Sequence, residues 1–138
     1  MTKWGDTVMA FCVCGSKKDY SVCCEPFLTG KAKARTVRQL VRSRYAAYAI
    51  GGHAEYLLQT WHPSTAGNIK RAELNTSEFR WDSLQILGHQ QKGNLGQVEF
   101  IARYKDAEGE DHIHHEISLF QRLKGVWYYL NGRVDNQR

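Results

Sequence analysis

The spacing of apolar residues changes once along this chain, from a helical period to strict alternation. After residue 36 apolar side chains recur every three or four positions, which predicts one buried helix face made of Val37, Leu40, Val41, Tyr45 and Tyr48. Thr36 and Gln39 have the spacing of a capping box and begin this helix, and Gly51-Gly52 ends it. A second helix is expected from His53 to about Thr60, and Pro63 should stop it because proline breaks the hydrogen-bond ladder.

After a polar stretch, apolar and polar residues alternate, which is the pattern of half-buried strands. The alternating segments contain Leu84 and Ile86, then residues 98–104, 113–120 and 126–130. Glycine-containing turns separate them at Gly93–Gly96, 106–110 and Lys124–Gly125. Two helices followed by antiparallel hairpins predict an α+β fold, in which the helices pack on one face of a curved sheet.

Three of the six histidines, His112, His114 and His115, lie in or directly before the third alternating segment. His115 shares its parity with Ile113, Ile117 and Leu119, so the pattern predicts that His115 lies on the buried face. On the other face His112, His114 and Glu116 would lie about 7 Å apart. With a fourth ligand these three could hold a metal, although exposed histidines that pair across strands are the favoured interpretation.

A pocket between the first helix and the sheet is the expected place for any small-molecule site. Its candidate residues are Tyr45, Tyr48, Trp61, His62 and His115, with Trp81 and Trp127 as further lining groups. Histidine can act as a general base and tyrosine as an acid. Aromatic residues at these spacings are more often part of an ordinary core with satisfied polar tips, which is the favoured interpretation, and the pocket interpretation stays open beside it.

The chain has 138 residues and a formal net charge of +5, and its basic residues are unevenly placed. Residues 1–44 contain nine Lys/Arg and three Asp/Glu, whereas residues 45–138 contain ten and eleven. The candidate basic patch consists of Lys31, Lys33, Arg35, Arg38 and Arg42. Such a patch can bind nucleic acid or an acidic protein, or it can be a solvated helix face.

Several classes of function find no support in the sequence. No run approaches the ~20 apolar residues of a membrane span. There is no phosphate-binding glycine loop and no dinucleotide-binding fingerprint. Residues 1–13 lack the layout of an export signal, so we expect a cytoplasmic protein.

All four cysteines fall in one short segment, Cys12-x-Cys14-x8-Cys23-Cys24. Zinc prefers four ligands at tetrahedral corners and thiolate sulfur suits it, so the cluster predicts a zinc site. Gly15 and Ser16 let the chain turn behind the second cysteine, and Lys17 and Lys18 place positive charge beside the thiolates. Two disulfides or four free thiols are the alternatives, and a reducing cytoplasm disfavours disulfides.

The cysteine spacing with its Gly15-Ser16 resembles the SEC-C motif, which also occurs at the C-terminus of the preprotein translocase ATPase SecA. Four further segments resemble the YchJ family: Cys24–Leu28, Val41–Ala49, Tyr56–Ser64 and Gly125–Tyr129. The resemblance implies a zinc-binding SEC-C segment followed by a cone-like, nuclear-transport-factor-two-like α+β domain. It implies no activity. We therefore expect a tail and zinc segment in residues 1–30 and the cone-like domain in residues 31–138.

These features favour a cytoplasmic zinc-binding adaptor or interaction protein. Its zinc segment and basic helix would dock an acidic protein or a ribonucleoprotein, and its pocket domain would be a scaffold or bind a small ligand. An enzyme that uses pocket histidine and tyrosine for acid–base chemistry is the alternative, and RNA or ribosome binding through the basic helix is the third. An open pocket with a titratable group favours the enzyme, and a pocket filled by aromatic rings favours the adaptor.

Overall fold

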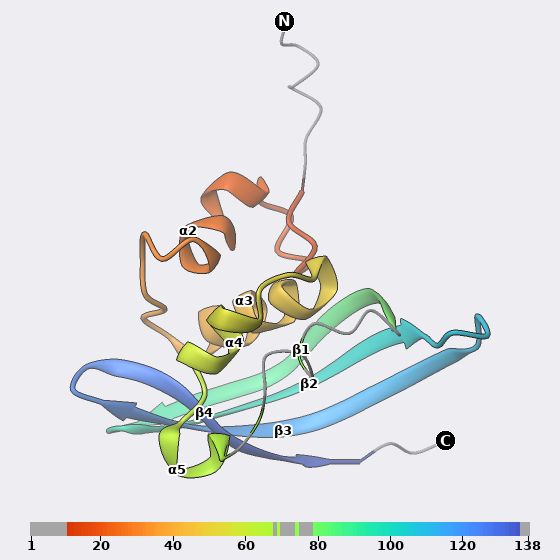
Figure 1. Ribbon diagram of the computed structural model, residues 1–138. Helices are drawn as coiled ribbons and strands as arrows, with labels where there is room; N and C mark the ends of the chain where they lie inside the picture. The colour runs from red at the N-terminus through yellow and green to blue at the C-terminus, as the bar shows by residue number, and fades with distance from the viewer. Residues whose placement is uncertain (1–10, 68, 70–73, 75–78, 136–138) are drawn as a thin grey trace, which may run out of the picture.

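The computed structural model describes residues 11–67, 69, 74 and 79–135. The predicted N-terminal tail, residues 1–10, lies outside the described residues. The elements are η1 (Tyr20–Val22), α2 (Glu25–Leu28), α3 (Val37–Ile50), α4 (Ala54–Gln59), α5 (Pro63–Ala66), β1 (Arg80–Lys92), β2 (Leu95–Lys105), β3 (Asp111–Leu123) and β4 (Val126–Val134). The predicted α+β fold is confirmed: α2, α3 and α4 lie on one face of a curved antiparallel sheet (Figure 1). No helix among the described residues is long and apolar enough to cross a membrane.

The main helix, α3, begins and ends where its local sequence predicts. The Thr36 hydroxyl accepts a hydrogen bond from the Gln39 amide at 3.1 Å, and the Gln39 side chain accepts one from the Arg35 amide at 2.7 Å. These bonds satisfy amide groups that have no partner inside the first turn. Gly51 ends the helix with φ of 84°, a left-handed conformation that glycine adopts without strain.

The predicted role of Pro63 as the stop of α4 is wrong. The helix α4 ends at Gln59, and Pro63 is the first residue of the short helix α5. His62 precedes it in an extended conformation and accepts a hydrogen bond from the Ser64 amide. A proline is favoured at the first helical position, because its missing N–H would have had no helical partner there.

The four strands pair in the order β1-β2-β3-β4, all antiparallel. Two-residue turns join the outer pairs, and Lys124-Gly125 has positive φ at both residues, which matches the twist of a hairpin. Between β2 and β3, the Asp106 carboxylate accepts hydrogen bonds from the amides of Glu108 and Glu110. This turn sets a register in which Ala102 pairs with His114, Phe100 with Glu116 and Val98 with Ser118.

One buried cluster joins α3, the sheet and the cysteine segment. Its members include Cys12, Cys14, Cys24, Val37, Leu40, Val41, Val98, Phe120 and Trp127. The helix approaches the sheet closely at Gly96, where an added Cβ would lie 2.6 Å from Cγ1 of Val37. The cysteine segment therefore packs directly on α3 and shares the core of the α+β domain.

The predicted buried face of β3 is wrong. Ile113 and Leu119 are 46% and 39% exposed, whereas Glu116 and Ser118 are 8% and 2% exposed and face α3. The pairing register places Glu116 and Ser118 beside the buried side chains of β2. Burial of these polar groups is tolerated because they form hydrogen bonds with one another.

Candidate functional site

The four cysteine sulfurs form a compact group. The Sγ atoms of Cys12, Cys14, Cys23 and Cys24 all lie within 4.8 Å of one another, and Cys14 and Cys23 approach to 3.6 Å. A zinc–sulfur bond of about 2.3 Å puts the corners of a tetrahedral site about 3.8 Å apart. The donor type, number and spacing of the cluster therefore fit a metal bound by four thiolates.

A tight turn and two short helices bring the sulfurs together. The Cys12 amide donates to the Lys18 carbonyl at 2.8 Å, which folds the chain back after Cys14. Gly15 allows this turn with φ of 85°, and the Ser16 hydroxyl lies 3.0 Å from the Cys23 sulfur. Cys24 directly precedes α2, so the ends of two elements fix the second cysteine pair.

The crowding of the thiols changes their proton affinities. Hydrogen bonds from Cys12 and Cys24 lower the pKa of the Cys14 thiol strongly. The hydrogen bond between Cys12 and Cys14 raises the pKa of the Cys12 thiol to about 11. Hydrogen bonds to Cys12 and Cys14 raise the pKa of the Cys24 thiol. The cluster thus holds one thiolate that its neighbours' protons stabilise, and a divalent cation can take the place of those protons.

A basic groove runs beside the cysteine cluster. It has a volume of about 810 Å³, and its walls include Cys23, Cys24, Lys18, Arg38 and Arg42, with no acidic residue. Arg42 is half-buried, and its Nη1 donates to the Cys14 carbonyl at 2.7 Å. Of the predicted basic patch, Arg38 and Arg42 line this groove, whereas Lys31, Lys33 and Arg35 are exposed elsewhere on the surface.

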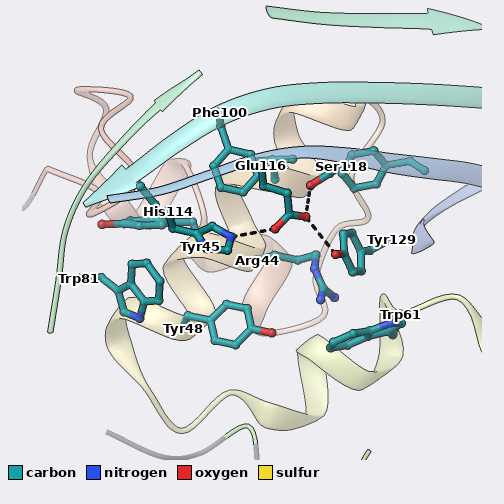
Figure 2. A pocket seen from close by; sticks show the side chains of 13 residues that line it. Arg44, Tyr45, Tyr48, Trp61, Trp81, Phe100, His114, Glu116, Ser118 and Tyr129 are labelled. Carbon is teal, nitrogen blue, oxygen red and sulfur yellow. Dashed lines mark hydrogen bonds and ion pairs between the residues drawn. The ribbon is translucent and has the colours of Figure 1, made fainter. Parts of the chain in front are cut away.

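A second candidate site lies between α3 and the concave face of the sheet. This cavity of about 240 Å³ is lined mainly by apolar and aromatic side chains: Val41, Tyr45, Tyr48, Trp61, Trp81, Phe100, Ala102, Phe120 and Tyr129. Its remaining lining residues are Arg44, His114, Glu116 and Ser118. Figure 2 shows His114, Glu116 and Ser118 on one side of the space and Tyr48, Trp61 and Trp81 around the other, with the Arg44 guanidinium between Trp61 and Tyr129.

The buried carboxylate of Glu116 is the centre of this polar group. His114 Nε2 donates to its Oε1 at 2.8 Å, and Ser118 and the Tyr129 hydroxyl donate to its Oε2 at 2.6 and 3.0 Å (Figure 2). Burial raises the pKa of the Glu116 carboxyl, but the three hydrogen bonds outweigh burial and hold that pKa below its ordinary value of 4.5. Glu116 is therefore ionised at neutral pH.

Arg44 contributes a buried positive charge to the same cavity. Its guanidinium lies between the rings of Trp61 and Tyr129, 4.8 and 4.7 Å from their centroids. Its Nη1 donates to the Leu57 carbonyl and the Thr60 hydroxyl at 2.8 and 2.7 Å. The arginine is thus held by rings and neutral oxygens, and its charge lies near Glu116 without a direct ion pair.

The structure brings together only part of the predicted pocket. Tyr45, Tyr48, Trp61 and Trp81 line the cavity, whereas His62, His115 and Trp127 do not. His62 follows Trp61 in an extended conformation, so its side chain points away from the cavity and contacts Gln121 at 2.7 Å. The predicted inward orientation of His115 is wrong: its Nε2 lies 2.7 Å from the Glu99 carboxylate on the opposite face of the sheet.

Five polar or charged lining residues were missed or assigned to the wrong face: Arg44, His114, Glu116, Ser118 and Tyr129. The turn at 106–110 carried a usable signal. Pairing Lys105 with Asp111 across that turn places His114 and Glu116 opposite Ala102 and Phe100, and directly paired residues share a face of the sheet.

The second metal site considered for β3 does not form. His112 lies 2.7 Å from the Asp106 carboxylate and stacks on Tyr104, while His114 bonds Glu116. Among the described residues, the cysteine cluster is the group whose ligand atoms converge for a metal.

Two sequence comparisons place the chain among known proteins. Residues 36–132 match the family model described as the middle NTF2-like domain of YchJ. A UPF0225 protein of Deinococcus radiodurans is 42% identical over 121 residues, which cover 87% of this chain and 86% of that protein. The family resemblance seen in the sequence is confirmed.

Two solved structures have a similar fold. The solution structure of a SEC-C motif containing protein from Rhodopseudomonas palustris is similar with a TM-score of 0.84 and 37% sequence identity. The match covers 91% of this chain and 98% of the Rhodopseudomonas chain. The second is a crystal structure from Exiguobacterium sibiricum, described as that of a Ca/calmodulin-dependent kinase II association domain. It matches with a TM-score of 0.57, and the match covers 74% of this chain and 91% of the Exiguobacterium chain. At 12% identity the latter supports the fold alone.

Proposed function

We propose that this chain, which belongs to the YchJ family, is a cytoplasmic zinc protein that docks an acidic protein or ribonucleoprotein partner beside its metal site. The observation that carries this proposal is the basic groove, whose wall contains Cys23 and Cys24 and no acidic residue. The cysteine segment and α3 together form the wall of this groove, so the shape of the docking surface depends on how the segment is held on α3.

Zinc is the metal that the donor set favours. Four thiolates form a soft, closed, four-coordinate set, which is typical of structural zinc sites and leaves no position for a substrate. Cys12, Cys14, Cys23 and Cys24 would hold the ion, and zinc would cross-link the turn after Cys12 to the start of α2 within the segment. Arg42 supports this arrangement because it binds the Cys14 carbonyl from α3.

The charge of the groove supports an acidic partner. Lys18 is exposed in the cysteine segment, and Arg38 is exposed on the outward side of α3, so the two flank the groove from different elements. Positive charges spread over a hollowed surface attract phosphate or carboxylate groups at long range. Binding through them should weaken steeply as salt rises.

The docking proposal is tested with the double variant Lys18→Glu/Arg38→Glu. We expect at least a tenfold loss of affinity for a fluorescent oligoribonucleotide or an oligo-aspartate peptide in anisotropy titrations at low salt. Arg103→Glu/Arg133→Glu is the matched control, because both arginines are exposed on strands outside the groove. Equal loss in the two double variants, or none in the first, would remove the groove as a docking site.

At Glu116 the cavity favours ligand binding over acid–base catalysis. It is an open space that contains a titratable carboxylate, which is the observation expected of an enzyme. A general base at neutral pH works best with a pKa near 7, however, and hydrogen bonds hold the pKa of Glu116 below 4.5. Glu116 is therefore better suited to accept a hydrogen bond than to remove a proton.

A further inference from the structure

We propose that the cavity beneath α3 binds a small, flat, neutral aromatic or heteroaromatic molecule through an N–H group donated to Glu116. This site is separate from the basic groove, because the two cavities share no lining residue. The inference rests on the shape of the cavity, its aromatic walls and the one acceptor position that remains on a buried carboxylate.

The walls of the cavity suit a flat ring system. Trp81 and Tyr45 form an edge-to-face pair at 6.1 Å, and Trp61 and Tyr129 form another at 5.3 Å. Aromatic rings placed in this way leave apolar surfaces against which a further ring packs favourably. At about 30 Å³ per water molecule, 240 Å³ has room for about eight waters, which is the size of a one- or two-ring compound.

Glu116 supplies the polar anchor. An ionised carboxylate has about four acceptor positions, and His114, Ser118 and Tyr129 occupy three of them. A ligand N–H can take the fourth. The three protein donors also fix the orientation of the carboxylate, so little freedom is lost when the ligand binds.

The charges of the cavity select a neutral ligand. Arg44 and Glu116 contribute one positive and one negative charge to the lining, so neither an anion nor a cation finds an excess of opposite charge. Arg44 is enclosed by two rings and donates to Leu57 and Thr60, which ties its guanidinium to the wall. A hydrogen-bond donor on an otherwise apolar ring therefore meets the chemistry of this site.

Indole and benzofuran form a matched pair of probes, because benzofuran has the same two-ring shape with an oxygen in place of the N–H. We expect indole to bind the full-length protein at least tenfold more tightly in NMR titrations, as a hydrogen bond to a charged group is worth a factor of about ten or more. Indole should shift the side-chain N–H signals of Trp61 and Trp81, which line the cavity, and leave Trp127 unchanged. Equal affinity for the two probes, or no shift of these signals, would overturn the proposal.

Charged probes and two variants complete the test. Benzoate should bind more weakly than indole, and a preference for benzoate would instead make Arg44 the anchor and refute the proposal. Glu116→Gln should reduce indole affinity at least tenfold. Glu99→Gln is its matched control. Glu99 pairs with His115 at 2.7 Å on the outer face of the sheet, just as Glu116 pairs with His114 on the face that lines the cavity.

Ala102→Leu provides a second route that leaves Glu116 intact. Ala102 is 2% exposed and lines the cavity, so a larger side chain there fills the space without removing a polar group. Loss of indole binding in this variant, with a native-like NMR spectrum, supports the site. Unchanged indole binding by a folded Ala102→Leu or Glu116→Gln protein contradicts it.

Discussion

At the scale of single residues, the unusual group is the ionised carboxylate of Glu116, which is only 8% exposed. A buried charge is costly unless it is hydrogen-bonded, and three donors on two strands meet that requirement. Gly132 also contributes, because an added Cβ there would collide with the Glu116 carboxylate. A glycine within a strand commonly marks such a close approach.

Glu116→Gln should destabilise the protein at neutral pH by about 1–3 kcal/mol, since the variant loses charge-assisted hydrogen bonds in a buried site. The pKa of Glu116 is lower in the folded protein than its ordinary 4.5. Its ionised form therefore stabilises the fold above about pH 4.5, and this contribution is lost as pH falls through the folded pKa. Urea unfolding at pH 7 and pH 3 should show a gap between wild type and variant that narrows in acid.

The exposed-face variant Glu99→Gln is the control for this pH dependence. Glu99 is more exposed than Glu116, with side-chain exposures of 39% and 10%. Its replacement should change the free energy of unfolding by less than about 1 kcal/mol. A gap for Glu116→Gln that stays constant down to pH 3 would contradict the assignment of an ionised, stabilised carboxylate.

At the scale of elements, the contact between α3 and the hairpin β1–β2 positions both candidate sites. Arg42 reaches the cysteine cluster and Arg44 reaches the cavity, from positions two residues apart on the same helix. The amide of Val37 donates to the Gln91 side chain at 3.0 Å, which joins the first turn of α3 to the end of β1. The distance between helix and sheet is set where Gly96 lies under Val37.

Gly96→Ala should destabilise the protein by about 1–3 kcal/mol, because overpacking a tight core forces side chains from their preferred positions. The added Cβ would lie 2.6 Å from Val37 Cγ1 and 3.3 Å from the Trp127 ring. Gly88→Ala is the matched control in the adjacent strand, since nothing lies within 4 Å of its Cβ position. Thermal unfolding should give a lower midpoint temperature for Gly96→Ala than for Gly88→Ala. Similar midpoints would contradict this prediction, because they would show that the Val37 side chain moves aside without loss of stability.

At the scale of the whole molecule, the cysteine segment and the α+β domain share one buried core. Cys12, Cys14 and Cys24 are 4%, 0% and 1% exposed, and they pack with residues of α3 and β1. The helices of the segment are short, because η1 spans three residues and α2 spans four. A metal that joins its four sulfurs would therefore contribute much of its stability.

The purified protein should contain about one zinc per chain, and chelation or Cys24→Ser should release residues 11–30 before the sheet. Binding of a structural zinc supplies on the order of 10 kcal/mol, and this energy would stabilise the cysteine segment. The central strands β2 and β3 pair with each other and do not depend on the metal. Hydrogen exchange should show lost protection in the cysteine segment and retained protection in those strands. Val22→Ser is the control at a 70% exposed site in the same segment, and it should change neither the zinc content nor the hydrogen-exchange protection. Metal analysis of a reduced preparation that finds no zinc would refute this prediction.

The parts of this protein that the sequence determined by itself are those that depend on near neighbours along the chain. Thr36 and Gly51 set the ends of α3 through bonds that span a single turn. The turns between strands follow from glycine positions, and the cysteine cluster follows from four thiols so close in sequence that one short segment brings them together. Each of these outcomes requires no knowledge of the rest of the fold.

Only the tertiary structure decided which face of β3 is buried and where the charged side chains lie. The apolar Ile113 and Leu119 would cost less to bury than Glu116 and Ser118, so the local pattern favours the wrong face. Pairing with β2 places Glu116 inward, and His114 and Tyr129, on β3 and β4, then satisfy it. A buried polar group is stable only with partners that are supplied by distant parts of the chain, and this is why the cavity and its anchor could not be read from hydrophobic periodicity.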